Sequence, residues 1–174
     1  MALRRAVALD PLNYRSHASL GRGFLFLRRY PEALAAYKDA QALDPDNPFL
    51  NANIGLTYYL LGDAESARSS CLNKAEENAF AQFCLAITYN KLGRHADAEA
   101  MLAKMRASRG DSDALRYSGI YARWGNTARA LDWLETAMRL RDPRLEFLKM
   151  DPIIDPLRNE PRFQAIKRAL KFPD

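Results

Sequence analysis

The chain has 174 residues, 48% of them hydrophobic and 27% charged, and its 26 Lys and Arg against 21 Asp and Glu give a net charge of +5. This composition is typical of globular proteins and excludes collagen-like, mucin-like and disordered classes. Basic and acidic stretches alternate along the chain, which argues against one continuous basic surface for nucleic acid. The apolar runs are shorter than the roughly 20 residues that a membrane-spanning helix needs.

An internal repeat begins near the N-terminus. Residues 6–11 read Ala-Val-Ala-Leu-Asp-Pro, residues 40–45 read Ala-Gln-Ala-Leu-Asp-Pro, and the two prolines are 34 residues apart. Small and large residues lie between them at regular positions: Leu20, Gly21, Phe24, Ala33, Tyr37 and Ala40. This spacing resembles the tetratricopeptide repeat (TPR), a unit of two helices, although His17 stands where the family often has Trp.

The pattern recurs three more times. The copies contain Ile54, Gly55, Tyr58, Gly62, Ala67 and Cys71; then Leu85, Ala86, Tyr89, Gly93, Ala98 and Leu102; then Tyr117, Ser118, Tyr121, Gly125, Ala130 and Leu134. We expect repeats at residues 14–47, 48–78, 79–110 and 111–142, after the second helix of a truncated repeat at 1–11. Their helix pairs are expected at 14–27 and 31–43, 48–61 and 64–76, 79–92 and 95–108, and 111–124 and 127–140.

Glycines have two roles in this pattern. A Gly or Ala opposite a bulky ring lets two antiparallel helices approach closely, as Gly21 would opposite an aromatic ring of the second helix. Gly62, Gly93 and Gly125 each follow a long apolar helix and precede a polar residue. That position suits a left-handed helix stop, where a side chain is unfavourable.

The composition changes after the fourth repeat. Residues 143–174 contain five of the nine prolines, and Pro152 and Pro156 should break the segment into short helical turns. Pro161 is expected at the start of a last helix, whose apolar face would dock on the preceding repeat as a cap. This end of the chain also resembles the C-termini of bacterial multi-domain TPR proteins that carry a nucleotide-cyclase or winged-helix domain.

Together, these features predict a single all-α domain over residues 1–174. The TPR resemblance implies a right-handed α-solenoid of antiparallel helix pairs (a TPR superhelix), closed by the C-terminal helical cap at 143–174. In such a superhelix the first helix of each pair lines a concave groove.

The resemblance also assigns the residues that face the groove. The expected peptide-binding set consists of Arg15, Arg22, Phe49, Asn53, Leu56, Tyr59, Phe80, Phe83, Ile87, Asn90 and Leu115. Its members in the second and third repeats are mostly apolar although the core positions there are apolar too, which suggests a surface that takes apolar anchors of a peptide. Arg15 and Arg22 would flank the groove at one end, with Lys91 and Arg123 toward the other. The alternative is that these rings pack helix against helix.

Candidate catalytic residues are few. His17 and His95 lack the spacing of a metal or catalytic motif, and the acid pairs Glu76-Glu77 and Asp111/Asp113 occupy links and helix starts, where the helix dipole favours negative charge. Cys71 is expected to be a buried thiol in a core position. A redox pair with Cys84 is the alternative, and it requires close Cβ atoms.

The sequence therefore predicts a non-enzymatic protein–protein interaction scaffold without metal or cofactor. It would bind a peptide or protein segment in the groove, without direct contact to nucleic acid or membrane, as the C-terminal part of a larger bacterial, cytoplasmic regulatory protein. Two alternatives remain. One is a self-association module for homo-oligomerisation, and the other is an accessory domain of a DNA-binding transcriptional regulator or nucleotide cyclase.

Overall fold

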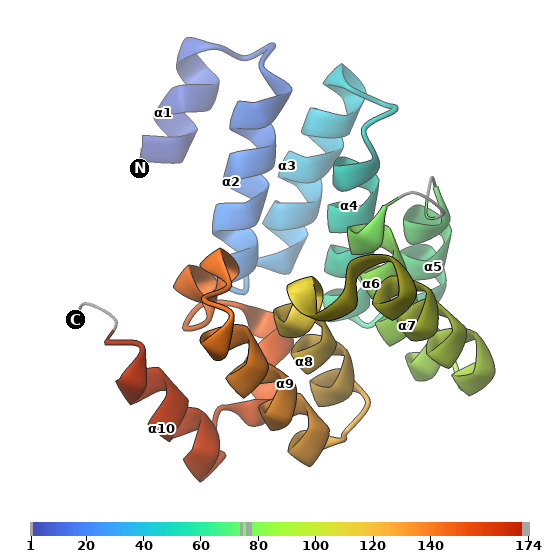
Figure 1. Cartoon of the computed structure of the whole chain (residues 1–174). Helices are drawn as coiled ribbons and strands as arrows, with labels where there is room; N and C mark the ends of the chain where they lie inside the picture. Colours follow the sequence, from blue (N-terminus) through green and yellow to red (C-terminus); the bar gives the residue numbers. More distant parts are fainter. Residues whose placement is uncertain (1, 74, 76–77, 172–174) are drawn as a thin grey trace. The chain divides into compact units, whose positions relative to one another are not determined.

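A computed structural model describes residues 2–73, 75 and 78–171 of the chain. Within this part of the chain every regular element is helical (Figure 1). The chain divides into two compact units, Met1–Ala98 and Glu99–Asp174, which are described one at a time below. The acid pair Glu76-Glu77 and Pro173, noted in the sequence, lie outside the described residues.

The first unit contains one single helix followed by helix pairs. The elements are α1 (Ala2–Leu9), α2 (Tyr14–Phe26) with α3 (Tyr30–Leu43), α4 (Pro48–Leu61) with α5 (Ala64–Leu72), α6 (Ala79–Lys91) and the start of α7 (His95–Arg109). These helices begin at the expected residues or within one of them. Asn13, Asn47 and Asn78 cap α2, α4 and α6, because each side chain accepts hydrogen bonds from backbone N–H groups of the first turn.

Small residues against rings hold the first pair together. Tyr37 of α3 is fully buried, and a Cβ added to Gly21 of α2 would lie 2.9 Å from its ring. Phe24 and Leu25 of α2 share one apolar cluster with Ala33 and other residues of α3 and α4. The expected close approach of helices at Gly21 is therefore confirmed.

The glycine helix stops are also confirmed. Gly62, Gly93 and Gly125 have φ angles of 95°, 75° and 77°, in the left-handed region where a side chain is strained. The corresponding turn after α2 uses Arg28 instead, with φ of 59°. The sequence drift between repeats thus left the backbone geometry of the turn in place.

The second pair differs from expectation in one helix and one bond. Helix α5 ends at Leu72, and Asn73 follows it with extended backbone, while the expected end at residue 76 lies outside the described residues. Cys71 and Cys84 form a disulfide that joins α5 to α6, with their Cα atoms 6.1 Å apart. The expectation of a free buried thiol at Cys71 is therefore wrong, and the alternative of a cysteine pair is the correct one.

Gly55 makes room for this disulfide. A Cβ at Gly55 of α4 would overlap Cys71 Sγ and would lie 2.9 Å from the carbonyl oxygen of Ala67. Both cysteines are fully buried. The glycine of the repeat pattern is therefore required here by a bond that spacing alone did not predict.

The second unit contains the rest of α7, a helix pair and the cap. A 3-10 turn, η1 (Gly110–Asp113), leads into α8 (Ala114–Arg123), which pairs with α9 (Thr127–Arg139). The cap consists of 3-10 turns η2 (Pro143–Phe147) and η3 (Pro152–Leu157) and of α10 (Pro161–Ala169), with Pro161 in its first turn as expected. The expected helix at 111–124 therefore starts later, because its first residues form the 3-10 turn.

Side chains of the cap complete the core of this unit. Leu148, Ile154, Leu157 and Phe163 are fully or almost fully buried. In the helix pair, Tyr117 meets Trp133 edge to face, with ring centroids 4.9 Å apart. Within the described residues, no helix is long and apolar enough to cross a membrane.

Candidate functional site

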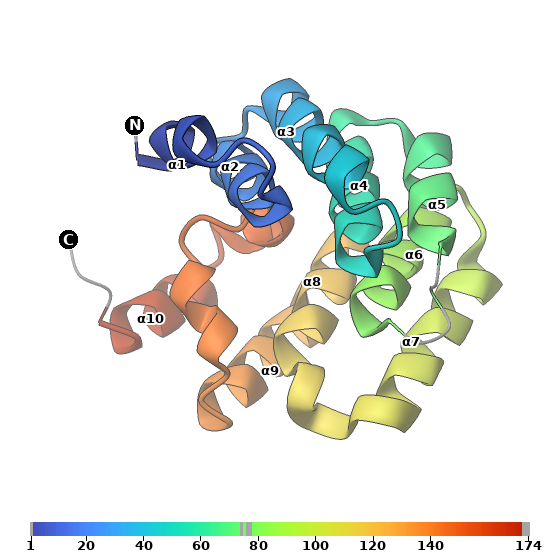
Figure 2. The same ribbon diagram turned by 90° about the horizontal axis from the view of Figure 1, so that it is seen from above.

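The candidate groove residues of the first unit lie on α2, α4 and α6. Seen from above, these first helices follow one another along one side of the unit, while α3 and α5 lie along the other side (Figure 2). Helices α4 and α6 are in contact, as are α3 and α4. The fold therefore places the expected groove positions of the second and third repeats on neighbouring helices.

Accessibility divides these residues into two groups. Arg15, Arg22 and Phe49 are exposed, and Asn53, Phe80 and Asn90 are half-buried. Buried residues form the second group: Leu56, Tyr59, Phe83 and Ile87 in the first unit, and Leu115 in the second. Phe49 is 59% exposed, whereas Tyr59 and Phe83 are 6% and 5% exposed. Most of the apolar set is thus held inside the protein, and Phe49 is its most accessible ring.

Three of these six exposed or half-buried residues share one repeat position. Arg15, Phe49 and Phe80 are each the second residue of the first helix in their repeats. Asn53 donates a hydrogen bond to the Phe49 carbonyl oxygen at 2.7 Å, and Phe80 stacks on Phe83 with ring centroids 6.0 Å apart. Arg15, Phe49 and Phe80, which we call the candidate row, therefore lie at the N-terminal ends of α2, α4 and α6.

The cations expected at the far end of the groove, Lys91 and Arg123, contact other groups of the same chain. The Lys91 ammonium lies 4.9 Å from the centroid of the Tyr59 ring and donates to the Tyr59 carbonyl oxygen at 3.4 Å. In the second unit, Arg123 donates to the carbonyl oxygens of Pro152 and Ile153 in the cap. Arg123 therefore fastens the cap to α8.

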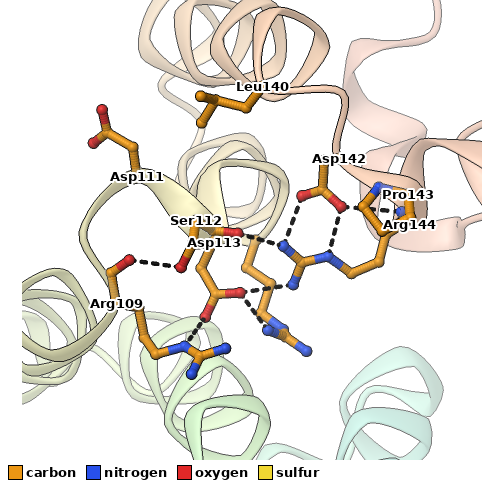
Figure 3. A pocket seen from close by; sticks show the side chains of 9 residues that line it. Arg109, Asp111, Ser112, Asp113, Leu140, Asp142, Pro143 and Arg144 are labelled. Carbon is orange, nitrogen blue, oxygen red and sulfur yellow. Dashed lines mark hydrogen bonds and ion pairs between the residues drawn. The ribbon is translucent and has the colours of Figure 1, made fainter.

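Sequence reasoning missed a cluster of charged residues in the second unit. A pocket of about 590 Å³ lies where η1 and α8 meet the segment after α9, and Figure 3 shows the side chains that line it. Asp113, only 1% exposed, lies between three guanidinium groups. Arg116 Nη1 donates to it at 2.6 Å, Arg144 Nη1 donates at 2.7 Å, and Arg109 Nε lies 3.4 Å away.

Arg144 is the bridge of this cluster. Besides Asp113, it donates to both carboxylate oxygens of Asp142, at 2.9 and 2.6 Å, and to the Ser112 carbonyl oxygen at 2.9 Å. Because Ser112 and Asp113 belong to η1 and Arg144 belongs to η2, these bonds fix the start of the cap to the start of the fourth repeat. The one clue in the sequence was acidic residues next to Arg at these two links.

The charges shift the pKa values of the cluster. Burial alone would raise the pKa of Asp113, but the positive charges of Arg116, Arg144 and Arg109 outweigh it and hold that pKa below its usual value. Burial also disfavours the charged form of Arg116 and therefore lowers its pKa. Next to the cluster, burial raises the pKa of Tyr117 to about 12, and its hydroxyl donates to the Gly110 carbonyl oxygen at 2.9 Å. The carboxylate of Asp113 therefore stays ionised.

The two histidines make local structural contacts. His17 Nε2 donates to the Pro11 carbonyl oxygen at 2.8 Å, and its Nδ1 lies 3.8 Å from the Asp39 carboxylate. His95 Nδ1 bonds Asn90 Oδ1 at 2.9 Å. In the part of the chain that the structure describes, no three His, Cys, Asp or Glu residues come together as metal ligands.

Comparison with known proteins agrees with this architecture. Residues 28–62 match the family described as "TPR repeat". The fold is that of TPR proteins. No curated protein sequence matches the chain.

Several solved structures share the fold. The chain is 17% identical to PilW, a widely conserved type IV pilus biogenesis factor, with a TM-score of 0.61 over 97% of this chain and 81% of that one. Pseudomonas aeruginosa PilF gives 19% identity and a TM-score of 0.58 over 97% and 80% of the two chains. YrrB, a TPR protein with an unusual peptide-binding site, gives 16% and 0.56 over 97% and 98%. At these identities the likeness establishes the fold alone.

Proposed function

We propose that the protein is a TPR scaffold that binds a peptide or protein segment along the first helices of its first unit. TPR folds generally serve protein interaction rather than catalysis. The observation that carries the proposal is the accessible ring of Phe49, which occupies the same repeat position as the exposed Arg15 and the half-buried Phe80.

This row favours a ligand with one apolar anchor and an acidic flank. Covering an exposed aromatic ring stabilises a complex by about 1.5–3 kcal/mol, because apolar surface leaves water. Arg15 and Arg22 on α2 would attract carboxylates next to that anchor. Because the row lies on preformed helices, little conformational entropy of the scaffold is lost on binding.

The test uses defined peptides and the full chain. A peptide array of leucine- and phenylalanine-centred sequences with Glu or Lys flanks identifies ligands, and calorimetry measures their affinity. We expect Glu-flanked peptides to bind more tightly than Lys-flanked ones. Phe49→Ala should weaken them about tenfold or more, and Arg15→Glu should remove the preference for Glu.

Leu27→Ala is the matched control, because Leu27 is 69% exposed but lies in the turn after α2, outside the candidate row. Circular dichroism confirms that each variant is folded. Tyr59→Ala and Phe83→Glu do not suit this test, since both side chains are buried and their loss would disturb packing. Equal affinity of Phe49→Ala and the unsubstituted chain would refute the proposal.

Self-association is the second candidate. Leu9, at the end of α1, is 76% exposed, and Leu12 is 78% exposed. Two such leucines close together in the sequence favour contact with another copy of this end of the unit. Light scattering over a range of concentrations should then show a mass that rises, and Leu9→Glu with Leu12→Glu should abolish the rise.

A place at the C-terminal end of a larger bacterial regulatory protein is part of the proposal, and an accessory domain of a DNA-binding regulator or nucleotide cyclase is the alternative to it. It is supported by the resemblance of the C-terminal residues to such proteins. The gene sequence around this reading frame tests it directly.

The disulfide is informative about the cellular compartment in which the protein lies. Cytoplasmic proteins seldom keep disulfides, whereas extracytoplasmic ones commonly do. The Cys71–Cys84 bond therefore favours an oxidising compartment over the cytoplasmic location expected from the sequence. Alkylation of thiols in intact cells, followed by mass spectrometry, tests this. Modified Cys71 and Cys84 before reduction would support the cytoplasm instead.

A further inference from the structure

A second pocket of the first unit lies away from the candidate row. It has a volume of about 340 Å³ and is lined by Lys38, Gln41, Asn51, Ile54, Tyr58, Ser69, Ser70 and Asn73. These residues come from the second helices α3 and α5, from Asn73 just after α5, and from α4 between them. The pocket lies in the size range of about 300–1,000 Å³ that is typical of small-ligand sites.

The floor of the pocket contains an unpaired polar group. Asn51 is only 3% exposed, and its Oδ1 accepts a hydrogen bond from Gln41 Nε2. Its Nδ2 is buried without a hydrogen-bond partner. Leaving a buried donor unpaired costs about 1–3 kcal/mol. Because Gln41 already donates to Asn51 Oδ1, the atom without a partner is the donor Nδ2, and it requires a hydrogen-bond acceptor.

The rim adds positive charge and further donors. The Lys38 ammonium lies 5.5 Å from the centroid of the Tyr58 ring, and Lys38 is exposed. Ser69 and Asn73 are exposed at the opposite side, on and just after α5. Among the described residues that line the pocket, none is Asp or Glu. The pocket thus offers one positive charge and neutral hydrogen-bonding groups.

We infer that this pocket binds a carboxylate group. One ammonium balances the single charge of a carboxylate, whereas a phosphate dianion calls for more cations. One carboxylate oxygen would accept from Asn51 Nδ2 and the other from Lys38 Nζ. The carboxylate belongs either to a Glu or Asp side chain of a partner protein or to a free dicarboxylate. The site is separate from the candidate row and does not depend on it.

The experiment is a titration of the full ¹⁵N-labelled chain followed by NMR. The probes are succinate, its uncharged analogue succinamide, and the peptide acetyl-Gly-Glu-Gly-amide. We expect saturable shifts of the Asn51 side-chain amide and of the Ser69 and Asn73 backbone amides with succinate or the peptide, and none with succinamide. Tighter binding of the peptide assigns the site to a partner's side chain, and tighter binding of succinate assigns it to a small molecule.

Two substitutions make the result decisive. Lys38→Gln should weaken binding about tenfold, as expected for the loss of one charge-assisted hydrogen bond. Lys104→Gln, an exposed lysine of α7, should leave the affinity unchanged. Phe49→Ala should also leave it unchanged, which separates this site from the candidate row. Shifts that do not saturate, that succinamide reproduces, or that saturate with the same affinity in Lys38→Gln would overturn the inference.

Discussion

Each of the two units is stabilised internally by a different kind of interaction. In Met1–Ala98, small residues lie against large apolar groups, as Gly21 does against Tyr37, and a buried disulfide joins α5 to α6. In Glu99–Asp174, a buried carboxylate at Asp113 gathers three arginines and ties the cap to the fourth repeat. The regular repeats of the first unit are thus stabilised by packing and one covalent bond, whereas the irregular cap of the second unit adds specific polar bonds to its buried apolar side chains.

Removal of the central carboxylate should have the largest effect. Asp113→Ala removes the buried carboxylate that Arg116 and Arg144 share, and loss of one member of a buried ion pair destabilises a protein by about 3–5 kcal/mol. Hydrogen exchange measured by mass spectrometry should show faster exchange in residues 99–171. Exchange in residues 2–73 should change little. Uniform loss of protection over both units would contradict this difference between them.

The same carboxylate gives a pH dependence with a defined sign. Because the folded-state pKa of Asp113 lies below its unfolded value of about 3.9, its stabilisation is complete above that pH and is lost as the pH falls through the folded-state pKa. The melting temperature should therefore fall more steeply with acid, below about pH 4, in the unsubstituted chain than in Asp113→Asn. Parallel pH profiles of the two proteins would argue against this role.

Loss of the disulfide should have the next largest effect, and in the other unit. Cys71→Ala with Cys84→Ala removes a cross-link between residues 13 apart in sequence. A disulfide that closes a loop of this size stabilises the folded protein by about 3 kcal/mol, chiefly because it lowers the conformational entropy of the unfolded chain. Urea unfolding with and without a reducing agent measures the effect. The double variant should be insensitive to the reducing agent, and equal stability of all forms would show that the bond contributes nothing.

Gly55→Ala should be destabilising by about 2 kcal/mol, as expected for an extra methyl group in a packed site. The added Cβ would overlap Cys71 Sγ, so most of the loss should disappear in a background that carries Cys71→Ala and Cys84→Ala. A double-mutant cycle of melting temperatures measures this coupling. Additive effects would place the crowding at the Ala67 carbonyl oxygen instead.

The smallest effect is expected at the surface of the cap. Arg162 of α10 pairs with Asp132 and Glu135 of α9 at 2.9 Å, but all three side chains are largely exposed. Such pairs contribute little, because water and salt screen them. Arg162→Ala should shift the melting temperature less than any variant above. A shift as large as that of Asp113→Ala would mean that surface charges also hold the cap.

The repeat pattern was sufficient to predict most of the backbone. The turns at Gly62, Gly93 and Gly125 follow from spacing, because each depends on a few neighbouring residues. The contacts of Asp113 with Arg144 join residues 31 apart in irregular segments, where no periodicity relates one position to another. The disulfide was foreseen only as an alternative, since side-chain proximity between two helices depends on their packing.

The candidate site shows the same limit. The exposed Phe49 and Arg15 were placed correctly on first helices, but the burial of Tyr59 and Phe83 was left open by the sequence. Helical position gives the direction of a side chain and not what covers it. The pocket at Asn51 had no signal in the sequence, because its residues belong to three helices and match no motif.

The close fit between Gly55 and the Cys71–Cys84 bond has a consequence for the history of this protein. We expect glycine at position 55 to have preceded the two cysteines, because a Cβ there would crowd the Cys71 sulfur. Among related sequences, alanine at this position should therefore accompany the absence of Cys71. The order of these substitutions on a phylogenetic tree would then show when the disulfide first appeared.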